Sequence, residues 1–96
     1  MDLVENHTAD LCRAIAEEIR QVGLLVEDLA TVLVADEDVA LKHIHRLQAF
    51  DLVIQRASES ARFLDRLASG MQSHQAIDGV CLEALQTRLR AATRAN

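Results

Sequence analysis

The chain has 96 residues, half of them apolar, and a formal net charge of −5. It contains no proline, only three glycines and only two aromatic residues, so the turn-rich composition that a β-sheet domain needs is missing. These features predict one all-α domain over residues 1–96, with a core built from aliphatic side chains.

The charge is unevenly distributed along the chain. Residues 1–38 contain ten acidic and two basic residues, a net of −8, whereas residues 39–96 contain eight basic and five acidic residues, a net of +3. The simplest interpretation is an acidic first helix beside more basic later helices. The only basic run, Arg88, Arg90 and Arg94, lies near a predicted helix C-terminus, where the macrodipole favours positive charge. A nucleic-acid partner is therefore not expected.

The two cysteines and the N-terminus favour a cytoplasmic protein. Cys12 and Cys81 fit no metal-binding or redox spacing and sit among apolar neighbours, so they are expected to be small buried or half-buried thiols in a reducing compartment. The acidic N-terminal residues lack the apolar stretch of a secretory signal. No apolar run reaches the roughly 20 residues that a membrane span needs, so no membrane contact is expected.

The first predicted helix covers residues 3–33. Its apolar residues recur at three- and four-residue steps, which places them on one face: Leu11, Ile15, Ile19, Val22, Val26, Leu29 and Leu33. Gly23 lies inside this helix and permits a kink. Near Gly23 the apolar residues spread over more than one side, which indicates contact with two neighbours.

The second predicted helix covers residues 37–69. Asp36 is a suitable N-cap, and Gly70 is suited to end the helix in a left-handed conformation. One continuous helix through both ranges is the alternative, but three adjacent acids at residues 36–38 are unfavourable inside a helix and favour a hairpin. The predicted core stripe of this helix is Leu47, Phe50, Ile54, Ala57, Ala61, Leu64 and Ala68.

The third predicted helix covers about residues 74–93, with Ser73 or Asp78 as its N-cap and Gly79 in a weak first turn. Its apolar face contains Ile77, Val80, Cys81, Leu85 and Leu89. Three such helices form an antiparallel bundle that leaves one groove open. A second copy would close this groove into a larger bundle, so a homodimer is expected.

A second apolar stripe is predicted on the middle helix, roughly opposite its core stripe. Its members are Leu41, Leu52 and Phe63, with His45 and Arg56 beside them. Two explanations remain open. Either the core is wide because a middle helix touches both others, or the stripe is an exposed patch for a protein partner or a second copy of the chain. In the second case the docking residues would be Leu41, Leu52, Arg56 and Phe63.

Asp51 and Gln55 lie one turn apart on the margin between these two stripes. By spacing alone, such a pair is typical of a solvated helix margin. The residues from Leu47 to Arg56, however, resemble the active helix of the CheZ chemotaxis phosphatases. That motif is an Asp followed four residues later by a Gln and preceded by an apolar or aromatic residue, here Phe50.

The resemblance implies a bacterial signalling protein built as a long helical hairpin, which pairs into a four-helix bundle and dephosphorylates a response regulator. Gln55 would orient the attacking water, and Asp51 would engage the regulator's active-site lysine. Attack on a phosphoryl group is mostly a matter of positioning, and a neutral amide can both donate to water and accept from it. If the chain is an enzyme, it is expected to be an aspartyl-phosphate phosphatase without a cofactor.

His45 supports a different interpretation. The run His45-Arg46-Leu47-Gln48-Ala49 resembles the histidine phosphotransfer motif, which would make His45 a phosphoacceptor. Gln48 and Ala49 stand where that family has Lys and Gly. A further alternative is a non-catalytic helical adaptor or oligomerisation module. His43 and His45 are two residues apart and therefore on opposite sides of a helix, so no metal site is expected.

Overall fold

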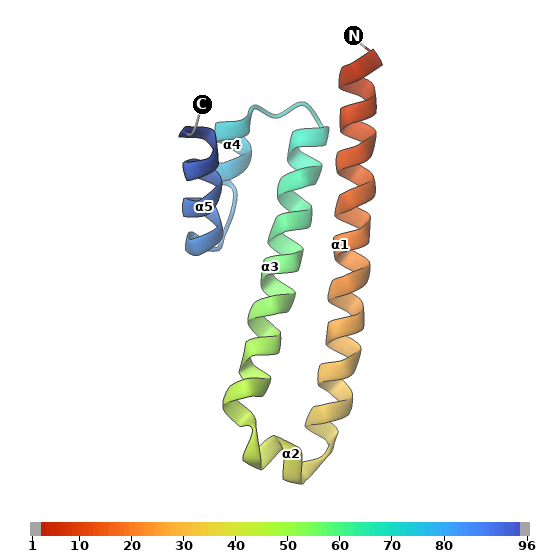
Figure 1. The fold of residues 1–96 in the computed structure, drawn as a ribbon, viewed down its shortest axis with the longest axis vertical. Helices are drawn as coiled ribbons and strands as arrows, with labels where there is room; N and C mark the ends of the chain where they lie inside the picture. The colour runs from red at the N-terminus through yellow and green to blue at the C-terminus, as the bar shows by residue number, and fades with distance from the viewer. Residues whose placement is uncertain (1–2, 95–96) are drawn as a thin grey trace.

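The computed structural model describes residues 3–94, with side chains from residue 7 onward, and all of its described elements are α-helices. The long helices α1 (Leu3–Ala35) and α3 (Ile44–Ala68) lie antiparallel, and the short α2 (Glu37–Lys42) turns the chain between them (Figure 1). The pair α4 (Ser73–Asp78) and α5 (Glu83–Arg94) packs beside the upper part of α3, on the side away from α1. The prediction of an all-α chain is confirmed.

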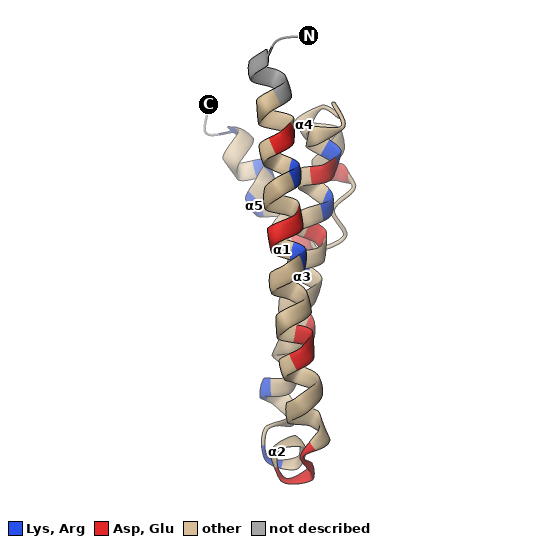
Figure 2. Cartoon of the chain, turned by 90° about the vertical axis from the view of Figure 1, so that its right-hand side faces the viewer, with Lys and Arg blue, Asp and Glu red and all other residues tan. Residues whose placement is uncertain are grey.

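The long helices α1 and α3 lie side by side (Figure 1), and α4 and α5 lie on opposite sides of the plane of these two helices (Figure 2). The molecule measures 56 × 25 × 18 Å, and its smallest dimension is less than two helix diameters. A molecule this thin encloses few large side chains. Accordingly, the buried apolar residues among those described are mostly alanines: Ala16, Ala61, Ala68, Ala76, Ile77 and Val80.

Caps at both ends of the α2–α3 segment are formed as predicted. The Asp36 carboxylate accepts hydrogen bonds from the backbone N–H groups of Asp38 and Val39 at 3.0 and 3.2 Å, which starts α2 and ends α1. Gly70 has φ +95°. At this end of α3 the N–H of Met71 donates to the carbonyl of Arg66 at 3.1 Å, the pattern of a Schellman motif. The hairpin, rather than one continuous helix, is confirmed.

Two of the three predicted helices are divided in the structure. The helix predicted over residues 37–69 breaks at His43, whose φ of −126° lies outside the helical range and separates α2 from α3. The six-residue helix α2 then carries the chain from one arm of the hairpin to the other. The helix predicted over residues 74–93 breaks after Gly79, which is the C-cap of α4. Five helices are therefore present in residues 3–94 instead of three.

The predicted caps of the third helix are not found. Gln72 occupies the N-cap position of α4, with no side-chain cap bond, whereas Ser73 is the first residue of α4 and Asp78 the last. The physical reason for the break lies in α3. The Glu59 carboxylate accepts a hydrogen bond from the backbone N–H of Cys81 at 3.0 Å, so this N–H is used outside a helix.

The face of α1 that packs on α3 repeats every seven residues. It consists of buried and half-buried residues at alternating three- and four-residue steps, which we call the inner seam: Ala9, Cys12, Ala16, Ile19, Gly23, Val26, Ala30 and Leu33. This spacing is that of a coiled coil. Every seventh residue is Ala or Gly, and a Cβ atom on Gly23 would lie only 3.5 Å from the Cβ atom of Ala57. This distance is an ordinary van der Waals contact, and Gly23 does not interrupt α1.

Polar contacts also join α1 and α3 in the upper half of the hairpin. Arg20 of α1 forms an ion pair with Asp65 of α3. The guanidinium of Arg13 donates to the carbonyl of Ala68, at the end of α3, at 3.1 Å. The tip of the hairpin around α2 is acidic (Figure 2), with Asp36, Glu37 and Asp38 all exposed. None of the described helices combines the length and the apolar character needed to cross a membrane.

Two side chains of α3 hold the α4–α5 pair in place. The Nε and Nη2 atoms of Arg66 both donate to the carbonyl of Ala76, at 3.1 and 3.0 Å. Glu59, only 7% exposed, accepts from the N–H of Cys81 and pairs with Arg62 at 3.3 Å. No buried side-chain nitrogen or oxygen in residues 7–94 is left without a hydrogen bond. The α4–α5 pair is thus attached to α3 through backbone groups.

Candidate functional site

Asp51 and Gln55 are both exposed and lie one turn apart in the first half of α3. Neither side chain has a hydrogen bond or ion pair with another residue in the part of the chain that the structure describes. The helical repeat places both on the same side of α3 as Ser58 and Arg62. These two residues line a groove with Leu24 of α1. We call the side of the hairpin that carries Leu24, Asp51 and Gln55 the polar face.

Gln55 also lies at the edge of a hollow between α3 and the α4–α5 connection. Ser58 and Glu59 of α3 line this hollow, together with Cys81 and Leu82. The Glu59 carboxylate is already used by its bonds to the N–H of Cys81 and to Arg62. The Gln55 amide, which has no hydrogen bond with another described residue, can both donate a hydrogen bond and accept one at this hollow.

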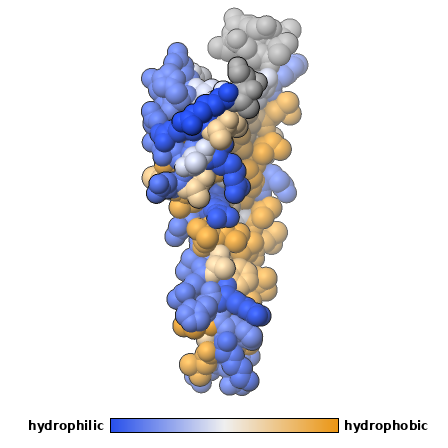
Figure 3. Space-filling model, turned by 60° about the vertical axis from the view of Figure 1, so that its left-hand side comes forward, coloured by the Kyte–Doolittle hydropathy of each residue, from blue (hydrophilic) through white to orange (hydrophobic). Residues whose placement is uncertain are grey.

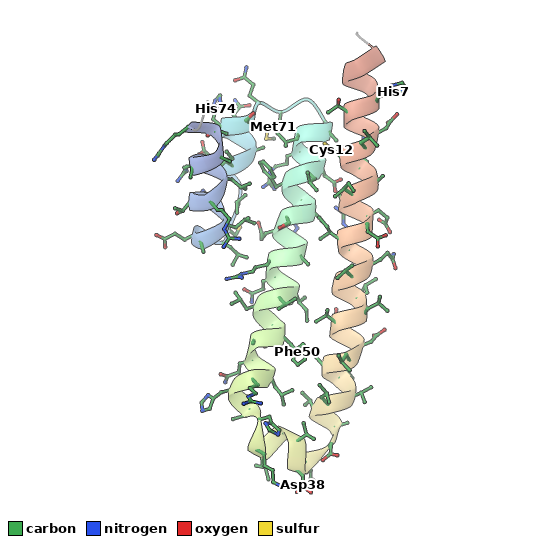
Figure 4. The ribbon with its side chains drawn as sticks, viewed as in Figure 1. His7, Cys12, Asp38, Phe50, Met71 and His74 are labelled. Carbon is green, nitrogen blue, oxygen red and sulfur yellow. The ribbon has the colours of Figure 1, made fainter. Side chains whose placement is uncertain are left out.

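The third residue of the CheZ-like motif points in the other direction. Figure 4 shows Phe50 between α3 and α1, where it belongs to the predicted core stripe. Phe50 is half-buried, and Asp51, the next residue, is exposed. Packing of the aromatic ring against α1 thus fixes the rotation of α3 and turns Asp51 and Gln55 outward.

Two of the four predicted docking residues lie beside the α4–α5 pair, and the other two lie away from it. Leu41, which is 80% exposed, and Leu52 lie on the lower part of the hairpin, where no other described helix covers them. Phe63 is half-buried, between the two α3 residues, Glu59 and Arg66, that hold the α4–α5 pair. Arg56 is exposed and lines a small hollow against α5. The wide-core explanation therefore fits Phe63, and the exposed-patch explanation fits Leu41 and Leu52.

The histidines and cysteines do not converge on a site. His45 is exposed near the start of α3, and His43 is exposed at the break before it. Among the residues that the structure describes, no three His, Cys, Asp or Glu side chains come close enough together to hold a metal ion. Both cysteines are free thiols: Cys12 is half-buried in the inner seam (Figure 4), and Cys81 is exposed, contrary to the expectation of a buried or half-buried thiol.

The structure shows a second apolar surface along α1, where the sequence indicated apolar residues on more than one side only near Gly23. It consists of exposed residues that we call the outer stripe: Leu11, Ile15, Val22, Leu25, Leu29 and Val32. Figure 3 shows hydrophobic side chains running along the molecule beside the hydrophilic surface of α5. Four of these residues were predicted to share one face with Ile19, Val26 and Leu33, which in fact belong to the inner seam. The seven-residue repeat of Ala16, Gly23 and Ala30 is the signal that separates the two surfaces.

The structure thus defines a helical hairpin with a short helical pair packed on one arm. The chain belongs to the family described as a domain of unknown function, DUF8776, whose model matches residues 4–96. Comparison with curated proteins and with solved structures gave no match. The family description names no activity, so function has to be inferred from the polar face and the outer stripe.

Proposed function

We propose that this chain is a small bacterial signalling protein that binds a response regulator or chemotaxis component through the polar face of α3. The observation that carries the proposal is the placement of Asp51 and Gln55. Both are exposed, one turn apart, on a continuous helix of 25 residues, and neither is engaged by another described residue. A regulator can therefore reach both groups at once without a rearrangement of the hairpin.

On this proposal the pair promotes hydrolysis of the regulator's aspartyl phosphate. Water attacks the phosphorus, the bond to the aspartate oxygen breaks, and the products are inorganic phosphate and a free carboxylate. The Gln55 amide orients the water, and the Asp51 carboxylate pairs with a lysine beside the regulator's phosphorylation site. Such a reaction needs correctly positioned groups on a rigid support, and packing of Phe50 against α1 supplies that support.

The test measures phosphate loss from response regulators phosphorylated with acetyl phosphate. The wild-type chain should accelerate the loss for its cognate regulator, and Gln55→Ala should reduce that acceleration at least about tenfold because the water is no longer held. The matched control is Gln48→Ala. Gln48 is also exposed and lies two turns earlier on the same side of α3. Equal acceleration by the two variants would show that Gln55 has no part in the reaction.

Two other results of the same experiment identify the alternatives. Binding of a regulator without faster phosphate loss would make the chain a non-catalytic adaptor. Transfer of phosphate to the chain itself, as an acid-labile and base-stable adduct that His45→Ala abolishes, would make it a histidine phosphotransfer protein. His45 is exposed, as that role requires.

The adaptor or oligomerisation module is the second candidate, and it is favoured by the exposed apolar residues on both arms of the hairpin. Under either candidate we propose that the chain works in the cytoplasm as a homodimer, in which a second copy completes a larger bundle. Light scattering should then give roughly double the chain mass of 10.6 kDa. A particle of single-chain mass would exclude the dimer.

A further inference from the structure

The outer stripe has the spacing of a second coiled-coil seam. Its six residues, each between 47% and 69% exposed, follow one another at steps of 4, 7, 3, 4 and 3 residues. These are successive a and d positions of a heptad repeat. Glu18 occupies the single position at which the apolar pattern is interrupted. An apolar heptad repeat over three turns or more of an exposed face is the pattern of a helix that packs against another helix.

The direction of this second seam matches the geometry of a four-helix bundle. At about 100° per residue, the centre of the outer stripe lies roughly 100° around α1 from the centre of the inner seam. A helix at one corner of a four-helix bundle has two neighbours, about a right angle apart. In the described structure α3 is the neighbour on the inner seam, whereas no described helix covers the outer stripe.

We propose that a second copy of this chain docks on the outer stripe, with its α1 antiparallel to the first, so that two hairpins form a four-helix bundle. This inference rests on the homodimer proposed above and names its surface and orientation. A two-fold axis between Val22 and Leu25 places Val22 opposite the partner's Leu25 and Ile15 opposite the partner's Val32. The stripe is therefore complementary to itself, as a two-fold interface requires.

Charge selects the antiparallel orientation over the parallel one. In a parallel dimer Glu18 would face its own copy, and the two acidic tips at residues 36–38 would lie together. In the antiparallel dimer Glu18 lies opposite the partner's Leu29, and the acidic tip comes to the level of the partner's Leu11, far from the partner's own tip. The antiparallel arrangement thus avoids both like-charge contacts of the parallel one.

The size of the outer stripe and its position are compatible with this role. The distance from Leu11 to Val32 is about 32 Å along the helix, and a strip one helix wide covers on the order of 300 Å², a size at which exposed apolar patches commonly mark interfaces. Leu24 and Leu25 point to opposite sides of the inner seam. Docking on the Leu25 side therefore leaves the polar face with Asp51 and Gln55 accessible in the dimer.

The test compares two neighbouring leucines by sedimentation equilibrium. Leu25→Glu should raise the dimer dissociation constant about 100-fold or more, because each dimer loses two buried leucines. Leu24→Glu is the matched control and should change the constant by less than about threefold. Glu18→Leu should tighten the dimer about tenfold, since it completes the heptad pattern. Circular dichroism should show unchanged helix content for all three variants, because each replaces an exposed side chain.

Each other outcome contradicts a defined part of the inference. A wild-type chain that stays monomeric at about 100 µM would exclude the dimer itself. A dimer that Leu25→Glu and Leu24→Glu weaken equally, or not at all, would stand but would use a surface other than the outer stripe. Orientation is measured with spin labels on an Asp38→Cys variant in which Cys12 and Cys81 are replaced by Ser. The antiparallel dimer separates the labels by about 40 Å, and a separation below about 25 Å would exclude it.

Discussion

Replacing Gly23 by Ala should stabilise the fold, although Gly23 is buried in the inner seam between α1 and α3. A Cβ atom at this position would lie 3.5 Å from the Cβ atom of Ala57, an ordinary van der Waals distance. The backbone there is helical and has no positive φ. Since Ala exceeds Gly in helix propensity by about 1 kcal/mol, Gly23→Ala should raise the free energy of unfolding by about 1 kcal/mol.

The assay is thermal and urea unfolding followed by circular dichroism, at one protein concentration because dimerisation contributes to apparent stability. For a chain of this length 1 kcal/mol corresponds to an increase in Tm of about 4–8 °C. Gly23→Leu is the complementary variant. It should lower stability by about 1–3 kcal/mol, because the larger side chain overfills the space beside Ala57. A lower Tm for Gly23→Ala would refute the reasoning, since it would mean that the seam is already too close for a methyl group.

Two further predictions concern the ends of α3 and the attachment of α5. Gly70→Ala should lower the free energy of unfolding by about 1–2 kcal/mol, because the backbone φ of +95° at this position is unfavourable for Ala. Nothing lies within 4 Å of the new Cβ atom, so the loss would come from the backbone alone. An unchanged Tm would contradict this explanation. Glu59→Ala should cost about 1–3 kcal/mol and speed hydrogen exchange at the Cys81 amide, because that N–H loses its acceptor. Glu59→Gln should cost less, since its amide oxygen can still accept, and equal losses for the two variants would show that the hydrogen bond is unimportant.

The parts of the fold that sequence reasoning found are those with local chemical signals. Asp36 and Gly70 each combine a residue type and a neighbourhood that define a cap, and both caps are present. The break at His43 has no such signal, because Lys42 and Ile44 are compatible with a continuous helix. It follows from the need to cross between two packed arms, which is a tertiary constraint.

The division of α1 into two surfaces was harder to see because hydrophobicity alone is misleading there. The inner seam uses Ala16, Gly23 and Ala30 at its closest contacts, and these residues contribute little to an apolar pattern. The large side chains that dominate the pattern, such as Leu25 and Leu29, are the exposed ones. Small residues at seven-residue steps therefore indicate the packed face more reliably than large ones in this chain.

For the candidate site, the sequence predicted that Asp51 and Gln55 would be at least partly exposed on one face, and the structure agrees. It could not predict where along α3 the contact with the α4–α5 pair would end. That boundary separates Phe63 from Leu52, and it depends on Glu59 and Arg66 reaching the backbone of residues 76–81.

The attachment of the C-terminal helices by Arg66 and Glu59 has a consequence for sequence divergence within the family. Both side chains form hydrogen bonds with peptide groups: Arg66 donates to the carbonyl of Ala76, and Glu59 accepts from the amide of Cys81. Every amino acid provides a backbone carbonyl, and every one except proline provides the N–H needed at position 81. Substitutions should therefore be tolerated at positions 76 and 81 within the family. Arg66 and Glu59 should be substituted rarely, or both together. The exposed surface of the α4–α5 pair can therefore change in sequence while the pair stays attached to α3.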